Sequence, residues 1–349
     1  MKQEERVKKI AEFIVHKGFK VKEGEVVVIS GDWGSNHFIN EAVAKEVYDA
    51  GAKAAMFITK PAPTHGKAAD AVIPFEPFVA MMEHVDYWLD TGTMGWLYSD
   101  AFETVLKKYK NMKYWLLSIM GVDELEEMFS IYTPEMAALC KELNALVMKH
   151  KKLRIVDQLG TDCTFEIDEN HRNVAQIGEI NEPGFYTCPG MYNMVPKIGS
   201  LNGKAVVKCI YADPWGLVDD PVTVNFKDGR ITTIEGKDTD VVNRFTKWLA
   251  SFDDNIYKVS HINFGLLPKY QDFTDHGIKN ERMWGGINFG FGHTSPVDMP
   301  PEGQISANHL DICTAKSTAY VGDELVMKDG EFVHPSMKAY ADKILADLA

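Results

Sequence analysis

The sequence predicts an α/β N-terminal domain with a mostly parallel sheet, followed by an α+β C-terminal domain with an antiparallel sheet or partial barrel. The chain has 349 residues, which is more than one average domain contains. Short apolar strands alternate with helices in its first part, whereas short strands separated by Gly, Asp and Pro dominate the remainder. We therefore expect a Rossmann-like domain at residues 1–150 and a second domain at 151–349.

The first domain shows the alternation that is typical of a parallel α/β sheet. Residues 25–30 (EVVVIS) form a short run rich in β-branched side chains, which indicates a buried strand. A helix is predicted from about Asn36, and Gly51 stands where a helix C-cap would be. Further strands are expected at 54–59, 86–91 and 114–118.

The loop after the first strand contains Gly31, Gly34 and Ser35. This spacing is not the GxGxxG of a dinucleotide-binding loop, so a simple tight turn is the favoured interpretation. We accordingly expect no nucleotide cofactor.

The end of the first domain is marked by a strongly signalled helix. Thr133 is a good N-cap, Pro134 suits the first turn and Glu135 adds an acidic side chain there. The helix is expected to end at His150, where we place the domain boundary.

The second domain is predicted to consist mainly of antiparallel strands. Asp228-Gly229 and Asp329-Gly330 each lie between two strand-like runs, as in two tight hairpins. A helix is predicted from Asp238, and the segment from Pro335 is again helical in pattern. The sequence INFG occurs at 262–265 and again at 287–290, either by chance or because two strands are equivalent. The remaining strands are expected at 153–157, 161–168 and 204–212.

Composition excludes several classes of function. Lys and Arg total 37 against 50 Asp and Glu, so the net charge is −13 and neither nucleic acid nor an anionic membrane is an expected partner. The N-terminus lacks the apolar core of a signal peptide, and no apolar run approaches the ~20 residues of a membrane span. The five cysteines are scattered and form no CxxC. We expect a cytoplasmic protein.

The most informative local motif is His309-Leu310-Asp311. In a strand, residues i and i+2 point to the same face, so an imidazole and a carboxylate would project together. Such a pair can hold two positions on a divalent cation. The alternative is a hydrogen-bonded His–Asp pair with a purely structural role.

Two further histidines could complete the site. His261 lies at the start of an apolar strand, 259–265, and would give a two-histidine, one-carboxylate set that suits Fe(II) with three open positions. His293 lies in a Gly-rich segment, 291–296. It is expected to act as an acid or base or to contact substrate, with a structural loop histidine as the alternative.

Four segments resemble the 2,5-dihydroxypyridine 5,6-dioxygenase group, which is related to the aminopeptidase T family of metallopeptidases. The resemblance implies that His261, His309 and Asp311 hold iron, and that the protein opens a small hydroxylated N-heteroaromatic ring with dioxygen. The segments that carry it are GTDCTFEID (160–168), SHINFGLLP (260–268), GGINFGFGH (285–293) and NHLDICT (308–314).

The aminopeptidases differ from this chain at their additional metal ligands. That family has a glutamate just before the first of two glycine-containing strands, where this chain has His261. It has a histidine in the second of these strands, where this chain has Asn288. An earlier glutamate of that family falls near Met191. Methionine and asparagine are poor ligands for a second hard cation, so one metal is expected. Fe(II) is the expected metal, with Zn or Mn as the alternative.

The substrate pocket is expected to differ from that of the dioxygenase. The segment 184–192 lacks the histidines of that group, and its aromatic residues Phe185, Tyr186 and Tyr192 are predicted either to stack on a planar ring or to pack in the core. Asn288 is a further expected substrate contact, and Tyr98 is a second candidate acid or base.

We expect a homo-oligomer. Two other classes of function stay open. One is a metal-dependent hydrolase of the aminopeptidase T type, which would use a metal-bound water. The other is a non-catalytic binding module, which would bind its ligand even in the presence of a chelator.

Overall fold

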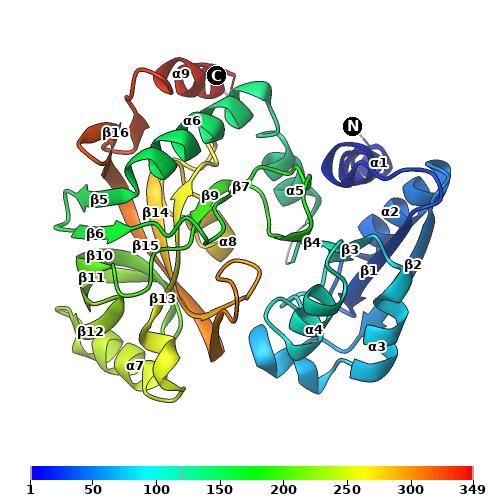
Figure 1. Cartoon of the computed structure of the whole chain (residues 1–349), viewed down its shortest axis with the longest axis horizontal. Coiled ribbons are helices and arrows are strands. Elements are labelled where there is room, and N and C mark those ends of the chain that lie inside the picture. Colours follow the sequence, from blue (N-terminus) through cyan, green and yellow to red (C-terminus); the bar gives the residue numbers. More distant parts are fainter. Residues whose placement is uncertain (1, 119–120, 348–349) are drawn as a thin grey trace. The chain divides into compact units, whose positions relative to one another are not determined.

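The computed structural model describes residues 2–118 and 121–347. The chain divides into two compact units, which are coloured by sequence position in Figure 1. The first unit comprises Met1–Tyr132 and Gln176–Pro189, and the second comprises Thr133–Ala175 and Gly190–Ala349. The domain boundary expected at about residue 150 stays a prediction.

The first unit contains the predicted parallel sheet. Every pairing in it is parallel, which confirms the α/β class of this region. Its fifth strand was not predicted, because it is three residues long and comes from a later segment of the chain. The strands lie in the order β2 (Lys53–Thr59), β1 (Val26–Asp32), β3 (Tyr87–Asp90), β4 (Lys113–Leu116), β8 (Gly184–Tyr186).

The helices of the first unit follow the alternation that the sequence predicts. The helix expected from Asn36 begins there, since the side chain of Asn36 accepts a hydrogen bond from the N–H of Ile39. The large rings of Trp88, Phe102 and Tyr114 pack edge to face in the core. The α-helices are α1 (Gln3–Glu12), α2 (His37–Asp49), α3 (Phe75–Met81), α4 (Asp100–Lys108) and α5 (Val122–Phe129), and a π-helical segment, Phe13–Phe19, follows α1.

The second unit is built on antiparallel strands, as the sequence predicts. Four strands close into a small barrel, because each of them pairs with the next and the last pairs with the first: β5 (Lys152–Asp157), β6 (Asp162–Glu166), β10 (Asn202–Tyr211) and β15 (Gln304–Val321). The remaining strands are β7 (Val174–Gln176), β9 (Met191–Met194), β11 (Trp215–Lys227), β12 (Arg230–Glu235), β13 (Val259–Gly265), β14 (Gly286–Thr294), β16 (Glu324–Lys328) and β17 (Glu331–Phe332).

The two predicted hairpin turns are confirmed. Asp228 and Gly229 have φ angles of 52° and 78°, and they connect β11 to β12. Asp329 and Gly330 have φ angles of 49° and 87°, and they connect β16 to β17. Positive φ at both central residues is the requirement of a type I′ turn, which is why Asp-Gly marks these positions.

Helices cover part of this sheet, and α6 and α9 lie side by side in Figure 1. The Thr133 side chain caps α6 by accepting from the N–H of Met136, and Asp238 caps α7 in the same way. The bounds of these helices are α6 (Pro134–His150), α7 (Thr239–Leu249), α8 (Gly277–Asn280) and α9 (Lys338–Ala346).

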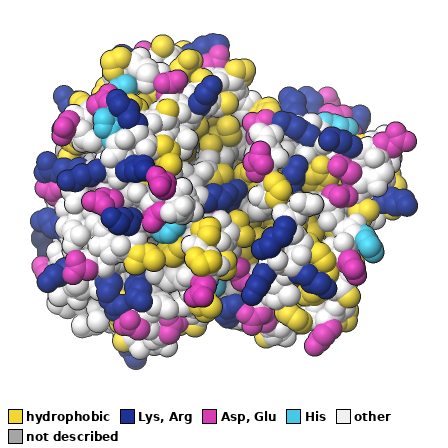
Figure 2. Space-filling model, in the orientation of Figure 1, with side chains coloured by type: hydrophobic (Ala, Val, Ile, Leu, Met, Phe, Trp, Pro, Cys, Tyr) yellow, Lys and Arg dark blue, Asp and Glu magenta, His cyan; other side chains and the backbone are white. Residues whose placement is uncertain are grey.

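Charged side chains of both signs occur on the surface, and the cysteines lie in the interior. Acidic and basic side chains are interspersed on the face that Figure 2 draws. Within residues 2–118 and 121–347, no helix combines the length and apolarity needed to cross a membrane. The five cysteines are free thiols and are buried.

Candidate metal centre

Three adjacent strands of the second unit bring the predicted metal ligands together. In the register of β13, β14 and β15, His261 faces Gly290, and Gly290 faces Asp311. His309 precedes Asp311 by two residues on β15, so both side chains project from the same face of the sheet. The sheet therefore assembles one site from two segments that are about 50 residues apart.

Gly290 is required on the central strand because of the space that His261 occupies. A Cβ atom at residue 290 would lie 2.4 Å from Nε2 of His261 and 2.5 Å from its Cε1. The imidazole thus lies directly above the glycine backbone and reaches across β14 toward Asp311. This explains why a glycine stands in the interior of an otherwise strongly β-forming strand.

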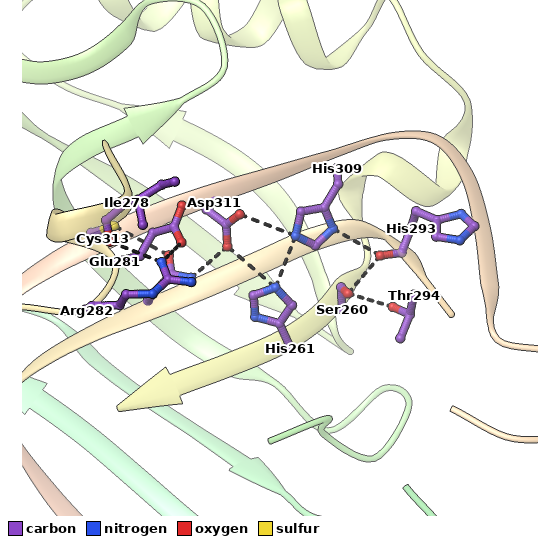
Figure 3. Close-up of polar contacts among 11 residues, drawn as sticks. Ser260, His261, Ile278, Glu281, Arg282, His293, Thr294, His309, Asp311 and Cys313 are labelled. Carbon is purple, nitrogen blue, oxygen red and sulfur yellow. Dashed lines mark hydrogen bonds and ion pairs between the residues drawn. The ribbon is translucent and has the colours of Figure 1, made fainter. Parts of the chain in front are cut away.

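The three side chains converge on one small volume (Figure 3). Nε2 of His261 lies 3.1 Å from Nε2 of His309 and 3.6 Å from Oδ1 of Asp311. Nε2 of His309 lies 3.4 Å from Oδ2 of Asp311. All three ligand atoms are within 4.8 Å of one another, so a single cation could contact all of them.

Hydrogen bonds from neighbouring residues orient two of the three ligands. Nδ1 of His309 donates to the main-chain carbonyl of His293 at 3.0 Å, which leaves the lone pair of Nε2 for a metal. The Asn288 amide donates to Oδ1 of Asp311 at 2.6 Å. Metal-binding histidines and carboxylates are usually held in this way, and the donor set fits a divalent transition metal.

The electrostatics of the site favour the metal-binding forms of His261 and Asp311, whereas they favour the protonated form of His309, whose proton a bound metal would have to displace. Burial lowers the pKa of His261 to about 4, so its imidazole is neutral at pH 7. Burial also opposes the charged forms of His309 and Asp311, but their mutual attraction outweighs it. That attraction raises the pKa of His309 and lowers the pKa of Asp311. Asp311 is therefore a carboxylate throughout the physiological range.

A buried ion pair beside the site was missed in the sequence. Nη1 of Arg282 donates to Oε2 of Glu281 at 2.7 Å, and only 3% of the Arg282 side chain is exposed. Figure 3 shows the guanidinium pointing toward Asp311. Burial, together with repulsion from Asp311, raises the pKa of Glu281 to about 7. The sequence shows only that two residues of opposite charge are neighbours, and this pattern is common on protein surfaces.

Asn263 is a second residue that the sequence did not single out as functional. It lies two positions after His261 on β13, and it therefore projects from the same face. Its side chain is fully buried and interacts with the imidazole of His261, whose pKa it raises against the larger opposing effect of burial. Asn263 is therefore a neighbour of the candidate ligand His261 rather than an exposed part of the site.

The remaining residues that the sequence predicts to be catalytic or substrate-binding lie in several different parts of the fold. The His293 side chain is buried at the end of β14, and Figure 3 shows its ring directed away from His309 while its carbonyl points to it. Tyr192 lies on β9 and its hydroxyl donates to Oδ1 of Asn144 at 2.7 Å. Phe185 and Tyr186 lie on β8, in the first unit. Tyr98 belongs to the same unit but to an earlier segment, and all three side chains are buried. Their catalytic and substrate-binding roles stay predictions.

Asn288 provides a test of the hydrogen bonds around the ligands. Asn288→Ala is expected to weaken metal affinity by roughly 10- to 100-fold, because Asp311 loses the donor that fixes its orientation. A matched control is Asn225→Ala, which removes an asparagine that bonds to exposed Thr233 and Glu235 on a neighbouring strand. Competition with a chelating dye measures both, and unchanged affinity in Asn288→Ala would contradict the assigned role.

Known proteins resemble this chain in sequence and in fold. A model of the 2,5-dihydroxypyridine 5,6-dioxygenase (NicX) family matches residues 15–334. No curated protein matches the chain significantly. The solved structure of 2,5-dihydroxypyridine dioxygenase from Pseudomonas putida KT2440 is similar over 97% of this chain and 100% of that chain, with a TM-score of 0.78 and 19% identity. Wild-type AmpT from Thermus thermophilus is similar over 94% of this chain and 99% of that chain, with a TM-score of 0.63 and 14% identity.

Proposed function

The chain belongs to the 2,5-dihydroxypyridine 5,6-dioxygenase (NicX) family, and on this premise we propose that it is a mononuclear non-haem Fe(II) dioxygenase that opens a small hydroxylated N-heteroaromatic ring. The observation that carries the proposal is the convergence of His261, His309 and Asp311 on one small volume. Two imidazoles and one carboxylate on one face of a six-coordinate ion leave three adjacent positions open.

The residues of the chain have distinct parts in this proposal. Bound Fe(II) would supply adjacent sites for a substrate oxygen and for dioxygen, together with the capacity to transfer electrons between them. His261, His309 and Asp311 would hold the metal, and Asn288 keeps Asp311 in its orientation. Asn263, which lies two positions after His261 on β13 and interacts with it, is proposed to help orient that imidazole.

Proton transfer needs a group that accepts the proton of the substrate hydroxyl. His293 and Tyr98 are the proposed acid or base, as the sequence suggested. Glu281 is an additional candidate, because its carboxyl group is buried beside Arg282 and lies close enough to Asp311 for their charges to interact.

The identity of the ring is the least constrained part of the proposal. The segment 184–192 lacks histidine. Its aromatic residues Phe185, Tyr186 and Tyr192 are proposed to contribute aromatic surface to the substrate site. A hydroxypyridine with a different substitution pattern is therefore a reasonable substrate. A cytoplasmic location and a homo-oligomeric state stay predictions.

A metal-dependent hydrolase is the second candidate, and the fold similarity to AmpT favours it. Such an enzyme would place a second metal near Met191 and Asn288. Met191 is buried on β9, and the amide of Asn288 is already engaged with Asp311. These residues leave few ligands for a second cation, which supports the oxygenase proposal.

Oxygen dependence tests the proposed reaction. We expect Fe(II)-loaded protein to consume dioxygen when a hydroxypyridine from a panel of rings is added, while the near-ultraviolet absorbance of the ring falls at the same rate. An oxygen electrode and a spectrophotometer measure both quantities, and omitting oxygen should stop the reaction. Turnover of any substrate without oxygen by Zn-loaded protein would overturn the oxygenase assignment.

A further inference from the structure

The main-chain carbonyl of His293 connects the metal centre to two buried hydroxyl groups, as Figure 3 shows. It accepts from Nδ1 of His309 at 3.0 Å and from the Ser260 hydroxyl at 2.9 Å. The Thr294 hydroxyl donates in turn to the Ser260 hydroxyl at 2.7 Å. A chain of hydrogen bonds therefore leads from Thr294 to the candidate ligand His309.

The strand pairing is irregular where this chain of hydrogen bonds lies. The register of β13 against β14 shifts next to His261, and Ser260 is the additional residue of this β-bulge. The register of β14 against β15 also shifts, around His293. Bulges often occur beside active sites, where they change the direction of a side chain or end the pairing of a strand. The irregular pairing is thus consistent with a local role for Ser260 in the metal centre.

Both hydroxyl groups belong to side chains that are removed from solvent. Ser260 is 0% exposed and Thr294 is 2% exposed. Burying a hydroxyl costs free energy unless it forms hydrogen bonds, and a pair of apolar side chains of the same shape would avoid that cost. The presence of two adjacent buried hydroxyls therefore indicates that their hydrogen bonds have a use.

The position of the His293 carbonyl matters because it determines which nitrogen of His309 can bind a metal. While Nδ1 donates to this carbonyl, the lone pair of Nε2 is left for a cation. The competing acceptor is Oδ2 of Asp311, which lies 3.4 Å from Nε2 and would hold a proton on the nitrogen that must bind the metal. A carbonyl that is fixed in place favours the metal-binding form of His309 and sets the direction of its lone pair.

We propose that Ser260 and Thr294 are positioning residues of the metal centre, whose hydroxyls hold the His293 carbonyl where it orients His309. Ser260 acts on the carbonyl directly, and Thr294 acts through Ser260. The proposal rests on the metal site of the proposed function, but it does not depend on a reaction with dioxygen. It gives the main chain of His293 a role that is separate from the one proposed for its side chain.

The affinity of the metal-free protein for Zn²⁺, measured by competition with a chelating dye, is the first test. Ser260→Ala is expected to lower the affinity about 10-fold, the lower limit of what the loss of an outer hydrogen-bond partner costs. Thr294→Val keeps the shape of the side chain without its hydroxyl and is expected to lower the affinity by less. Thr294→Ser keeps the hydroxyl and should retain wild-type affinity. Unchanged affinity in Ser260→Ala, or equal losses in the two Thr294 variants, would overturn the proposal.

A double variant tests whether the two hydroxyls act through one chain of hydrogen bonds. If Thr294 acts only through Ser260, Thr294→Val should have no further effect on Zn²⁺ affinity in the Ser260→Ala protein, and additive losses would contradict the proposal. Ser317→Ala is the matched control. Ser317 is also fully buried, lies on β15 and donates to the carbonyl of Ala315 at 2.9 Å, so its loss should leave the affinity unchanged. An equal loss in Ser317→Ala would show a general effect of removing a buried hydroxyl and would overturn the proposal.

Proton exchange at Nδ1 of His309 separates positioning from a merely structural role. In Zn²⁺-loaded protein with ¹⁵N-labelled histidine, nuclear magnetic resonance is expected to show a slowly exchanging Nδ1–H of His309 in the wild type and faster exchange in Ser260→Ala. The wild-type exchange rate in Ser260→Ala would overturn the proposal, whatever the change in affinity. Zn²⁺ binding with these differences, but without consumption of dioxygen by the Fe(II)-loaded protein, would contradict the proposed reaction and support the positioning role.

Discussion

Replacing His309 or Asp311 with alanine is expected to abolish metal binding, and His261→Ala is expected to weaken it severely. His309 and Asp311 lie on one strand and are fixed by hydrogen bonds from their neighbours, so each loss removes an oriented ligand. The loss should exceed the roughly 10- to 100-fold that removal of an outer hydrogen-bond partner costs. Elemental analysis after dialysis against a dilute metal buffer measures it.

The control for these variants is His16→Ala. His16 is a partly exposed histidine in the first unit, where it bonds to Glu46, and its loss should leave the metal content unchanged. Circular dichroism of each variant distinguishes loss of metal from loss of fold. Full occupancy in His261→Ala would show that another residue supplies the third ligand.

Gly290→Ala is expected to reduce metal affinity about as much as His261→Ala, although residue 290 itself offers no ligand. The added Cβ would lie 2.4 Å from Nε2 of His261, so the imidazole must move away from His309 and Asp311. The Gly290 backbone does not require glycine for its conformation, since it is not among the described glycines with positive φ. The variant should therefore fold normally but hold metal weakly.

Gly236→Ala is the matched glycine control. Its added Cβ would have Val242 as its nearest neighbour, at 3.2 Å, and Gly236 also lacks a positive φ. Chelator competition on the two variants compares their affinities directly. Wild-type affinity in Gly290→Ala would mean that His261 binds no metal, or that it does so from a different position.

Much of the fold could be predicted because local signals and global topology agree. The apolar run at 25–30, the Asn36 cap and the two Asp-Gly turns each specify a short stretch of backbone, and the structure contains each of them. Such agreement between local preference and fold is the normal state of a natural sequence. The convergence of the candidate metal ligands was predictable for the same reason, because alternation in a strand places His309 and Asp311 together.

The elements that escaped prediction depend on contacts between distant parts of the chain. Strand β8 is only three residues long, and it exists because it pairs with β4, about 70 residues earlier. The two INFG sequences lie on the adjacent antiparallel strands β13 and β14, where Asn263 pairs with Asn288. Neither the burial of Glu281 beside Arg282 nor the hydrogen bond between Thr294 and Ser260 has any periodic signature in the sequence.

The number of metal ions in anaerobically purified protein tests the central claim most directly. The structure brings together three ligand atoms for one cation, while the positions of a second metal are Met191 and the engaged Asn288. Elemental analysis is expected to find about one iron per chain in the wild-type protein and none in His309→Ala. Two metal ions per chain, both lost in His309→Ala, would contradict the mononuclear site and favour a two-metal hydrolase.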